Sequence, residues 1–403
     1  MSAGGFATAR LGRMHDIMAG HVERGTVPGL VMLVSRRGEE HADAIGMKAF
    51  DGGEPMRRDT IFRIASMTKP ITAAAAMILM EECKLRLDEP VDRLLPELAN
   101  RRVLKSLEGA LDDTVPARRP ITLRDLLTFR LGLGMIVGPP DRYPILKAIA
   151  DLGIVGFGPP QQSTPHDPDE WLRRLATLPL MYQPGERWLY NTGSYVLGVL
   201  IARAAGQHFE SFLHERIFAP LGMHDTSFSV PTEKLDRLAT SYWPDGDTGA
   251  LRLNDGVADS QWRRRPAFPD GGAGLVSTID DYAAFGSMLL NKGTHERARI
   301  LSRPSVDLMT TDHLTREQKA LSGLILDPAG HRGWGFGMAV VTGRDQIWAT
   351  PGRFGWDGGY GTSWASDPKE DLVAILMTQR AGLPSLSPVY LDFWNSVYQA
   401  IDD

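Results

Sequence analysis

The stretch Ile61-Phe-Arg-Ile-Ala-Ser66-Met-Thr-Lys69-Pro70, with the alanine-rich run that follows it to Met80, decides how this chain is organised. It predicts a short strand that runs into a long helix, with Ser66 at the turn and Pro70 in the first helical turn, where proline is tolerated. Backbone N–H groups at a helix N-terminus favour developing negative charge, as an acyl-transfer oxyanion requires. Lys69 lies three residues later on the same helical face and can reach the Ser66 hydroxyl. The stretch thus places a base beside a nucleophile.

Ser-x-x-Lys is a weak pattern by itself. A simpler interpretation makes Ser66 a helix cap and Lys69 a solvated charge. The chain also holds a second copy, Ser366-Asp-Pro-Lys369. There Asp367-Pro368 disfavours a helix and indicates a turn, so the second copy lacks the context of a nucleophile. Other parts of the sequence must decide between the two interpretations of Ser66.

The composition is that of a globular protein, with 403 residues of which 43% are hydrophobic and 23% charged, enough for two domains or one large composite domain. A net charge of −5 without runs of like charge argues against nucleic acid and anionic membranes as partners.

The only cysteine, Cys83, excludes an intrachain disulfide and a cysteine-based metal cluster, and we expect it to be buried near the end of the Ser66 helix. The N-terminal segment lacks the apolar core of a signal peptide, and no apolar run is long enough to cross a bilayer, which predicts a cytoplasmic protein.

Strand patterns gather at the two ends of the chain, and helical patterns fill its middle. The strand patterns lie at residues 30–35, 42–46, 333–341, 361–366 and 371–378, and the helices outside them at about 8–24 and 389–401. We therefore expect an α/β (α+β) fold in which both ends pair in one antiparallel sheet flanked by helices. The predicted domains are a discontinuous sheet domain, residues 1–60 and 333–403, and a mostly helical domain, residues 61–332, with the active site at their junction.

Two further stretches hold residues suited to chemistry. In Pro184-Gly-Glu-Arg-Trp-Leu-Tyr190-Asn-Thr192, Tyr190 stands just ahead of a predicted helix. A neighbouring ammonium could make Tyr190 a proton-transfer group, whereas the simpler alternative is a packing residue with its hydroxyl at the surface. In Gly352-Arg-Phe-Gly-Trp-Asp-Gly-Gly-Tyr-Gly361, the dense glycines allow a strand backbone to approach a ligand closely, or form a bulge or hairpin.

Together and in this order, the three stretches resemble the serine β-lactamase and penicillin-binding-protein superfamily, in its class C branch. The motifs are Ser66-Met-Thr-Lys69, Pro184-Gly-x-x-Trp-x-Tyr190 and Trp356-x-Gly-Gly. Within that superfamily the chain is most similar to the family VIII carboxylesterases and acyltransferases, and the resemblance covers nearly the whole chain. No Gly-x-Ser-x-Gly occurs, which excludes the nucleophile elbow of an α/β-hydrolase.

The resemblance implies a β-lactamase-like fold and two-step acyl transfer through a Ser66 acyl-enzyme, with no metal or organic cofactor. The implied catalytic residues are Ser66, Lys69 and Tyr190. Either Lys69 or Tyr190 as tyrosinate takes the Ser66 proton, and the choice stays open because the two titrate as a coupled pair. The backbone N–H groups of Ser66 and Gly359 are implied to bind the oxyanion. The implied substrate-binding residues are Trp356, Asp357, Gly358, Thr192 and Tyr360.

Two departures from the class C pattern favour esters over β-lactams. Class C enzymes have Tyr-x-Asn at the second motif; Thr192 here lacks the side-chain amide that holds the acylamino carbonyl of a β-lactam. Their Lys-Thr-Gly third motif is here Trp356-Asp357-Gly358, which puts an apolar wall where a lysine would face the carboxylate of the drug. We therefore expect a serine hydrolase that cleaves carboxylic esters of small uncharged substrates, with weak or no β-lactamase activity.

Other functions that use the same three residues stay open at this point. They are a class C-like β-lactamase, a D-amino-acid peptidase or amidase, and an acyltransferase that uses the same acyl-enzyme. A catalytically inactive binding relative would have lost one of the three residues, and all are present. The expected partner is a small-molecule ester, with neither nucleic acid nor a membrane, and the sequence leaves a homo-oligomer open.

Overall fold

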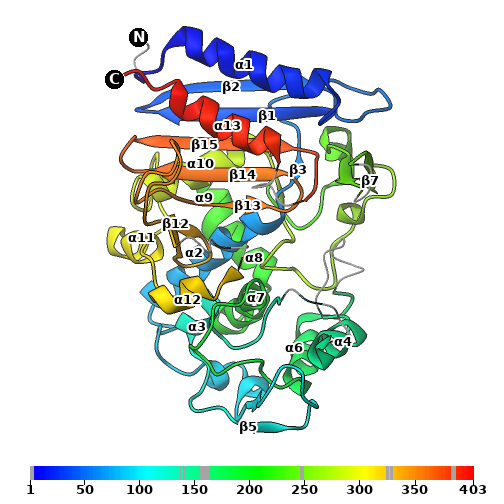
Figure 1. Cartoon of the computed structure of the whole chain (residues 1–403), viewed down its shortest axis with the longest axis vertical. Coiled ribbons are helices and arrows are strands. Elements are labelled where there is room, and N and C mark those ends of the chain that lie inside the picture. The colour runs from blue at the N-terminus through cyan, green and yellow to red at the C-terminus, as the bar shows by residue number, and fades with distance from the viewer. Residues whose placement is uncertain are drawn as a thin grey trace.

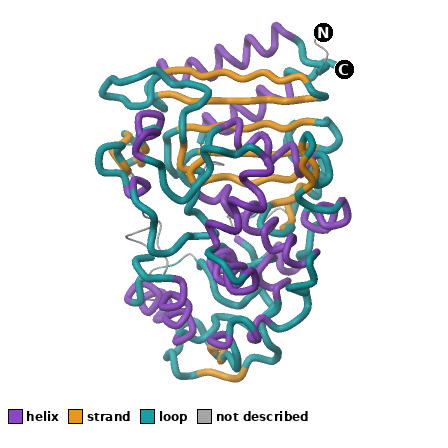
Figure 2. The backbone as a smooth tube through the Cα atoms, turned by 180° about the vertical axis from the view of Figure 1, so that it is seen from behind, coloured by secondary structure: helices purple, strands orange, loops and turns teal. Residues whose placement is uncertain are grey.

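The computed structural model describes residues 4–136, 138, 142–154, 164–245, 249–323, 326, 330–382 and 387–403. Seven antiparallel strands form one sheet in the order β11-β12-β13-β14-β15-β1-β2. The sheet fills the upper part of the molecule and most helices lie below it (Figures 1 and 2). Its strands are β1 (Gly29–Arg36), β2 (Glu39–Gly46), β11 (Arg332–Trp334), β12 (Ala339–Val341), β13 (Phe354–Gly358), β14 (Thr362–Asp367) and β15 (Leu372–Thr378). The prediction that both ends of the chain pair in one antiparallel sheet is confirmed.

Helices cover both faces of the sheet, which explains why its inner strands are apolar along their whole length. Alternate residues of a strand point to opposite faces. In β1, Val31 and Leu33 join the main hydrophobic core, whereas Leu30, Met32 and Val34 pack with residues of α1 (Thr8–Glu23) and α13 (Pro388–Gln399). These two helices lie together on one face, close to both ends of the chain (Figure 1). On the other face, α10 (Ile279–Leu290) packs against β14, β15 and β1.

The helical region below the sheet is built around α2 (Thr68–Glu81), which packs against α7 (Thr192–Ala205). A helix that is apolar on all sides is stable only inside a protein, and α2 is buried from its first residue to Leu79. The further α-helices among the residues that the structure describes are α3 (Leu123–Leu127), α4 (Pro144–Asp151), α6 (Pro168–Thr177), α8 (Phe209–Leu213), α9 (Ala219–Leu221), α11 (Arg303–Met309) and α12 (Arg316–Ala320). The described segments also contain four separate strand pairs: β3 (Phe62–Arg63) with β8 (Val276–Ser277), β4 (Arg102–Leu104) with β5 (Thr114–Pro116), β6 (Ser241–Pro244) with β7 (Leu251–Asp255), and β9 (Thr294–His295) with β10 (Ala298–Arg299).

Two local expectations are corrected. The run 333–341 is two strands joined by a turn at Gly337, where φ is +72° and a Cβ would lie 2.7 Å from the Lys69 carbonyl oxygen. Cys83 is exposed rather than buried, because the chain leaves α2 through a left-handed residue there, with φ of +59°. The division into domains at residues 60 and 333 stays a prediction, and α10 is a helix from the middle of the chain that packs on the sheet.

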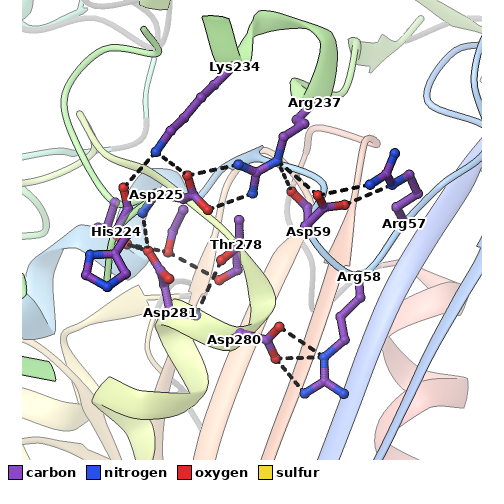
Figure 3. A network of polar contacts seen from close by, with 12 residues as sticks. Arg57, Arg58, Asp59, His224, Asp225, Lys234, Arg237, Thr278, Asp280 and Asp281 are labelled. Atoms are coloured by element: carbon purple, nitrogen blue, oxygen red, sulfur yellow. Dashed lines mark hydrogen bonds and ion pairs between the residues drawn. The ribbon is translucent and has the colours of Figure 1, made fainter. Parts of the chain in front are cut away.

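A network of charged side chains braces the segment that leads into β3 and Ser66 (Figure 3). Arg237 Nη2 lies 2.6 Å from Asp225 Oδ2, and Arg237 Nε donates to the carbonyl oxygen of Asp59. Arg58 Nε lies 2.9 Å from Asp280 Oδ1 in the first turn of α10. Residues 57–59, the segment around residues 225–237 and the start of α10 are therefore tied together just ahead of the Ser66 turn.

Candidate active site

Ser66 sits where a strand becomes a helix, as the sequence predicts. The chain passes from β3 through a 3₁₀ turn, Ala65–Met67, directly into α2. Ala65 has a φ of +44°, a left-handed conformation that is strained for a residue with a side chain. The turn is held from both sides, because Ile64 N–H donates to Leu275 O at 3.0 Å and Tyr282 Oη donates to Met67 O at 2.8 Å. Ser66 remains partly exposed between its two buried neighbours.

Lys69 is hydrogen-bonded to the Ser66 hydroxyl, with 2.8 Å between Nζ and Oγ. Its amine also donates to the Gly272 carbonyl oxygen at 2.6 Å. Lys69 is 0% exposed, which rules out the interpretation as a solvated charge. Burial lowers the pKa of Lys69 because the charged form loses its hydration, and the carboxylate of Asp270 opposes this effect. A lysine of this kind can be neutral near neutral pH and accept a proton.

Tyr190 completes the group. The Lys69 ammonium position lies 4.6 Å from the centroid of the Tyr190 ring, and the Tyr190 hydroxyl is hydrogen-bonded to Ser66. Trp356 Nε1 donates to the same hydroxyl at 2.8 Å. Burial raises the pKa of Tyr190, and the hydrogen bonds from Ser66 and Trp356 offset only part of this rise. Tyr190 is therefore a neutral phenol at rest, which favours Lys69 as the base.

The wall beside Tyr190 is aromatic. Each ring lies 4.7–6.4 Å, centroid to centroid, from at least two of the others, and the rings belong to Phe129, Trp188, Tyr190, Trp334 and Trp356. The chain around Tyr190 is fixed by the bridge between Met135 and Tyr190 and by Asn191, whose φ is +89°. An apolar wall of this kind suits an uncharged acyl or alcohol group.

The glycines after Trp356 let β13 approach the Ser66 turn. A Cβ at Gly358 would collide with the carbonyl oxygen of Ile64, so only glycine allows this contact. At Gly359 a Cβ would meet nothing within 4 Å, and within the described ranges the N–H of Gly359 has no hydrogen-bond partner. The Gly359 N–H is thus free to serve an oxyanion.

Three of the predicted substrate-binding residues are not seen to contact this group. Asp357 points to the opposite face of β13, where Ser363 Oγ donates to its carboxylate at 2.7 Å. Tyr360 packs edge-on against Trp262, with ring centroids 5.8 Å apart. Thr192 is buried in the first turn of α7. The predicted residues that the fold brings together are Ser66, Lys69, Tyr190, Trp356, Gly358 and Gly359.

Two features of the site were not predicted from the sequence. One is the indole N–H of Trp356, a residue that the motif predicts only as an apolar wall. The other is Asp270, a buried acid at the start of Asp270-Gly-Gly-Ala-Gly274, whose glycines were the only signal. In the described part of the chain, no three His, Cys, Asp or Glu side chains are grouped so that they could hold a metal ion. Across the same residues, no helix is both long and apolar enough to span a bilayer.

The family model described as Beta-lactamase matches residues 14–392, so the chain belongs to the Beta-lactamase family. Protein Rv1367c of Mycobacterium tuberculosis is 42% identical over 373 residues, which cover 91% of this chain and 88% of that protein. Esterase EstB of Burkholderia gladioli is 32% identical over 392 residues, 92% of this chain and 90% of EstB. The solved structure of "EstCE1, a hydrolase with promiscuous acyltransferase activity" superposes with a TM-score of 0.78 at 27% identity, covering 96% of this chain and 98% of EstCE1. The chain is a serine hydrolase of this family with a β-lactamase-like fold.

Proposed function

We propose that this chain is a serine carboxylesterase of family VIII type, which cleaves esters of small uncharged substrates through a Ser66 acyl-enzyme. The observation that carries the proposal is the fully buried Lys69 amine, 2.8 Å from the Ser66 hydroxyl oxygen at the start of a helix. The similarity to Esterase EstB supports the choice of esters.

In the first half of the reaction, neutral Lys69 takes the Ser66 proton while Ser66 Oγ attacks the ester carbonyl carbon. The carbonyl oxygen becomes an oxyanion that accepts hydrogen bonds from the N–H groups of Ser66 and Gly359. When the intermediate collapses, the bond between the carbonyl carbon and the alcohol oxygen breaks, and the alkoxide leaves. Its proton comes from the Tyr190 hydroxyl, and Tyr190 recovers one from the lysine ammonium.

In the second half, water attacks the acyl-enzyme and gives up a proton to the same pair of residues. The bond between the acyl carbon and Ser66 Oγ then breaks, the leaving Oγ takes that proton back from the pair, and the carboxylic acid is released. Neutral Tyr190 suits the role of proton donor to the leaving group, because burial holds its pKa above the usual value. Trp356 Nε1 supports this step, since a hydrogen bond to the phenol oxygen strengthens as that oxygen becomes negative.

An acyltransferase is the second candidate function. If an alcohol takes the place of water in the second half, the same acyl-enzyme yields a new ester. EstCE1, a hydrolase with promiscuous acyltransferase activity, is 27% identical to this chain and supports this candidate. The β-lactamase and the D-amino-acid peptidase or amidase are less favoured, because Trp356 and Thr192 lack the groups that would bind a charged or acylamino ligand.

The test is hydrolysis of a short-chain p-nitrophenyl ester by the wild type and by Ser66→Ala. Loss of the nucleophile should reduce kcat/KM by about 10³-fold or more while the melting temperature stays near that of the wild type. A chromogenic cephalosporin measured alongside should be turned over slowly, with a high KM. Near-normal ester turnover by Ser66→Ala, or a cephalosporin kcat/KM at or above that of the best ester, would contradict the proposal. A cytoplasmic location and a small-molecule ester as partner stay predictions from the sequence.

A further inference from the structure

One buried carboxylate beside the site takes no part in the steps above. Asp270 is 6% exposed, and it lies in the same protein interior as the fully buried Lys69. A carboxylate is costly to bury unless hydrogen bonds or an opposite charge compensate it. The N–H groups of Gly272 and Ala273 hydrogen-bond the Asp270 carboxylate, and the Lys69 amine, in its protonated form, is the opposite charge that acts on it.

The segment Asp270-Gly-Gly-Ala-Gly274 folds around its own carboxylate. Gly272 N–H donates to Asp270 Oδ1 at 2.6 Å, and Gly274 N–H donates to the Asp270 carbonyl oxygen at 3.0 Å. A Cβ at Gly272 would lie 3.1 Å from Asp270 Oδ1, which is closer than nearly all real contacts of this kind. The Gly272 N–H shares its peptide unit with the Gly271 carbonyl. The carboxylate also accepts a hydrogen bond from the Ala273 N–H, which shares its peptide unit with the Gly272 carbonyl. The carboxylate therefore orients both peptide units.

Two side chains of α2 bind this segment one turn apart. Lys69 Nζ donates to the Gly272 carbonyl oxygen at 2.6 Å, and Thr72 Oγ1 donates to the Gly271 carbonyl oxygen at 2.7 Å. The carbonyl that receives the Lys69 amine thus belongs to the residue whose N–H is held by Asp270. The carboxylate reaches the lysine through a single residue, Gly272.

We propose that Asp270 is a positioning residue that acts through Lys69: its carboxylate fixes the carbonyl that binds the amine, and it supplies the buried negative charge opposite that amine. The inference rests on the proposed function of Ser66 and Lys69. It adds a residue from a segment some two hundred positions away in the chain to the control of the proton on Lys69.

The negative charge of Asp270 raises the pKa of both proton-transfer groups, Lys69 and Tyr190. Burial alone would make Lys69 a weak base, and the carboxylate raises the pKa of Lys69 towards the working range. Burial and, to a smaller extent, the same carboxylate raise the pKa of Tyr190, which keeps the phenol protonated. The titratable groups that face Asp270 are Lys69, Tyr190, Tyr195 and Tyr360; Asp357 also acts on Tyr190, and Arg63 and Asp255 act on Tyr360.

The test compares Asp270→Asn with the wild type over a pH series of kcat/KM for a p-nitrophenyl ester. Asparagine keeps an oxygen for Gly272 N–H but removes the charge. Because a negative charge favours the lysine ammonium, its removal should move the acid limb of the profile to lower pH by roughly one to three units, and the weaker base should lower the plateau kcat. Labelling of Ser66 by a fluorophosphonate should show the same shift.

The matched control is Asp281→Asn, which removes another buried carboxylate that bonds Asp225 N–H and Thr226 Oγ1 and has no contact with Lys69. Its acid limb should coincide with that of the wild type. An Asp270→Asn limb that also coincides with the wild type overturns the inference. If Asp270→Asn does not fold, Gly272→Ala tests the positioning arm: kcat should fall with an unmoved limb, and an unchanged kcat overturns the inference. A wild type without ester turnover or Ser66 labelling contradicts the proposed function instead.

Discussion

The hydrogen bond from Trp356 to Tyr190 gives a sharp test of how Tyr190 works. Trp356→Phe removes the indole N–H that lies 2.8 Å from the Tyr190 oxygen and keeps an aromatic ring at that place. A hydrogen bond between neutral groups contributes about 0.5–1.5 kcal/mol, and one to a charged group about 1.5–3 kcal/mol. Because the bond is already present in the resting enzyme, only its strengthening counts. If Tyr190 becomes partly anionic in the transition state, the two ranges differ by about 1–1.5 kcal/mol, and kcat/KM should fall by roughly 5- to 15-fold.

The control for the lost ring area is Trp334→Phe. Trp334 packs edge-on against Trp356, with 4.7 Å between ring centroids, and its own indole N–H has no partner among the described residues. The same truncation there removes no hydrogen bond. Steady-state kinetics with a p-nitrophenyl ester, together with thermal melts, should show similar losses of stability but a much larger loss of kcat/KM for Trp356→Phe. Equal losses of kcat/KM in the two variants would refute the role of the N–H group.

Three further predictions concern the two proton-transfer groups, the pH dependence and the fold. Lys69→Ala and Tyr190→Phe should each reduce kcat by about 10²–10⁴-fold, as expected for a proton-transfer group, and a silent Tyr190→Phe would make Tyr190 a packing residue. In the wild type, kcat/KM should fall at acid pH as Lys69 takes up a proton. Because burial lowers the pKa of Lys69 below the usual pKa of a lysine, activity should persist at neutral pH. An acid limb of the profile near pH 10 would contradict this prediction. Gly355→Ala would push a Cβ to 2.7 Å from Ala365 Cα and should destabilise the fold by about 1–3 kcal/mol. Gly12→Ala, on an open part of α1, should instead stabilise it by about 0.5–1 kcal/mol. A Gly355→Ala variant as resistant to urea as the wild type would contradict the packing of β13.

Local patterns predicted much of the fold. The hairpin of β1 and β2 and the helix after Ser66 follow from periodicity and turn residues, which depend on neighbours in the sequence. The capping box at the start of α3, formed by Thr122 and Asp125, is likewise a local pattern that a sequence can show. The proximity of Ser66 and Lys69 follows from helical spacing alone.

The missing parts of the site depend on contacts between distant segments. Asp270 acts on Lys69 although the two are some two hundred residues apart in the sequence, and no local pattern marks an acid that acts on so distant a lysine. Asp357 is predicted in the site only when its motif is treated as a unit. Neighbours on a strand point to opposite faces, so Trp356 and Asp357 cannot both line one cleft. The strand period could have separated them, but only the packing shows which one faces Tyr190.

The position of β1 in the sheet has a consequence for the order of events during synthesis. One edge of β1 pairs with β2, which follows it at once, but the other edge pairs with β15, in register from Leu30 with Thr378 to Arg36 with Leu372. At translation rates of about 5–20 residues per second, the ribosome needs roughly twenty seconds to a minute to make the partner strand. Throughout this time an apolar strand edge stays unpaired, which is the kind of edge that templates aggregation. The sheet can close only after Thr378 has emerged, so a nascent chain stalled before β15 should depend on chaperones to stay soluble.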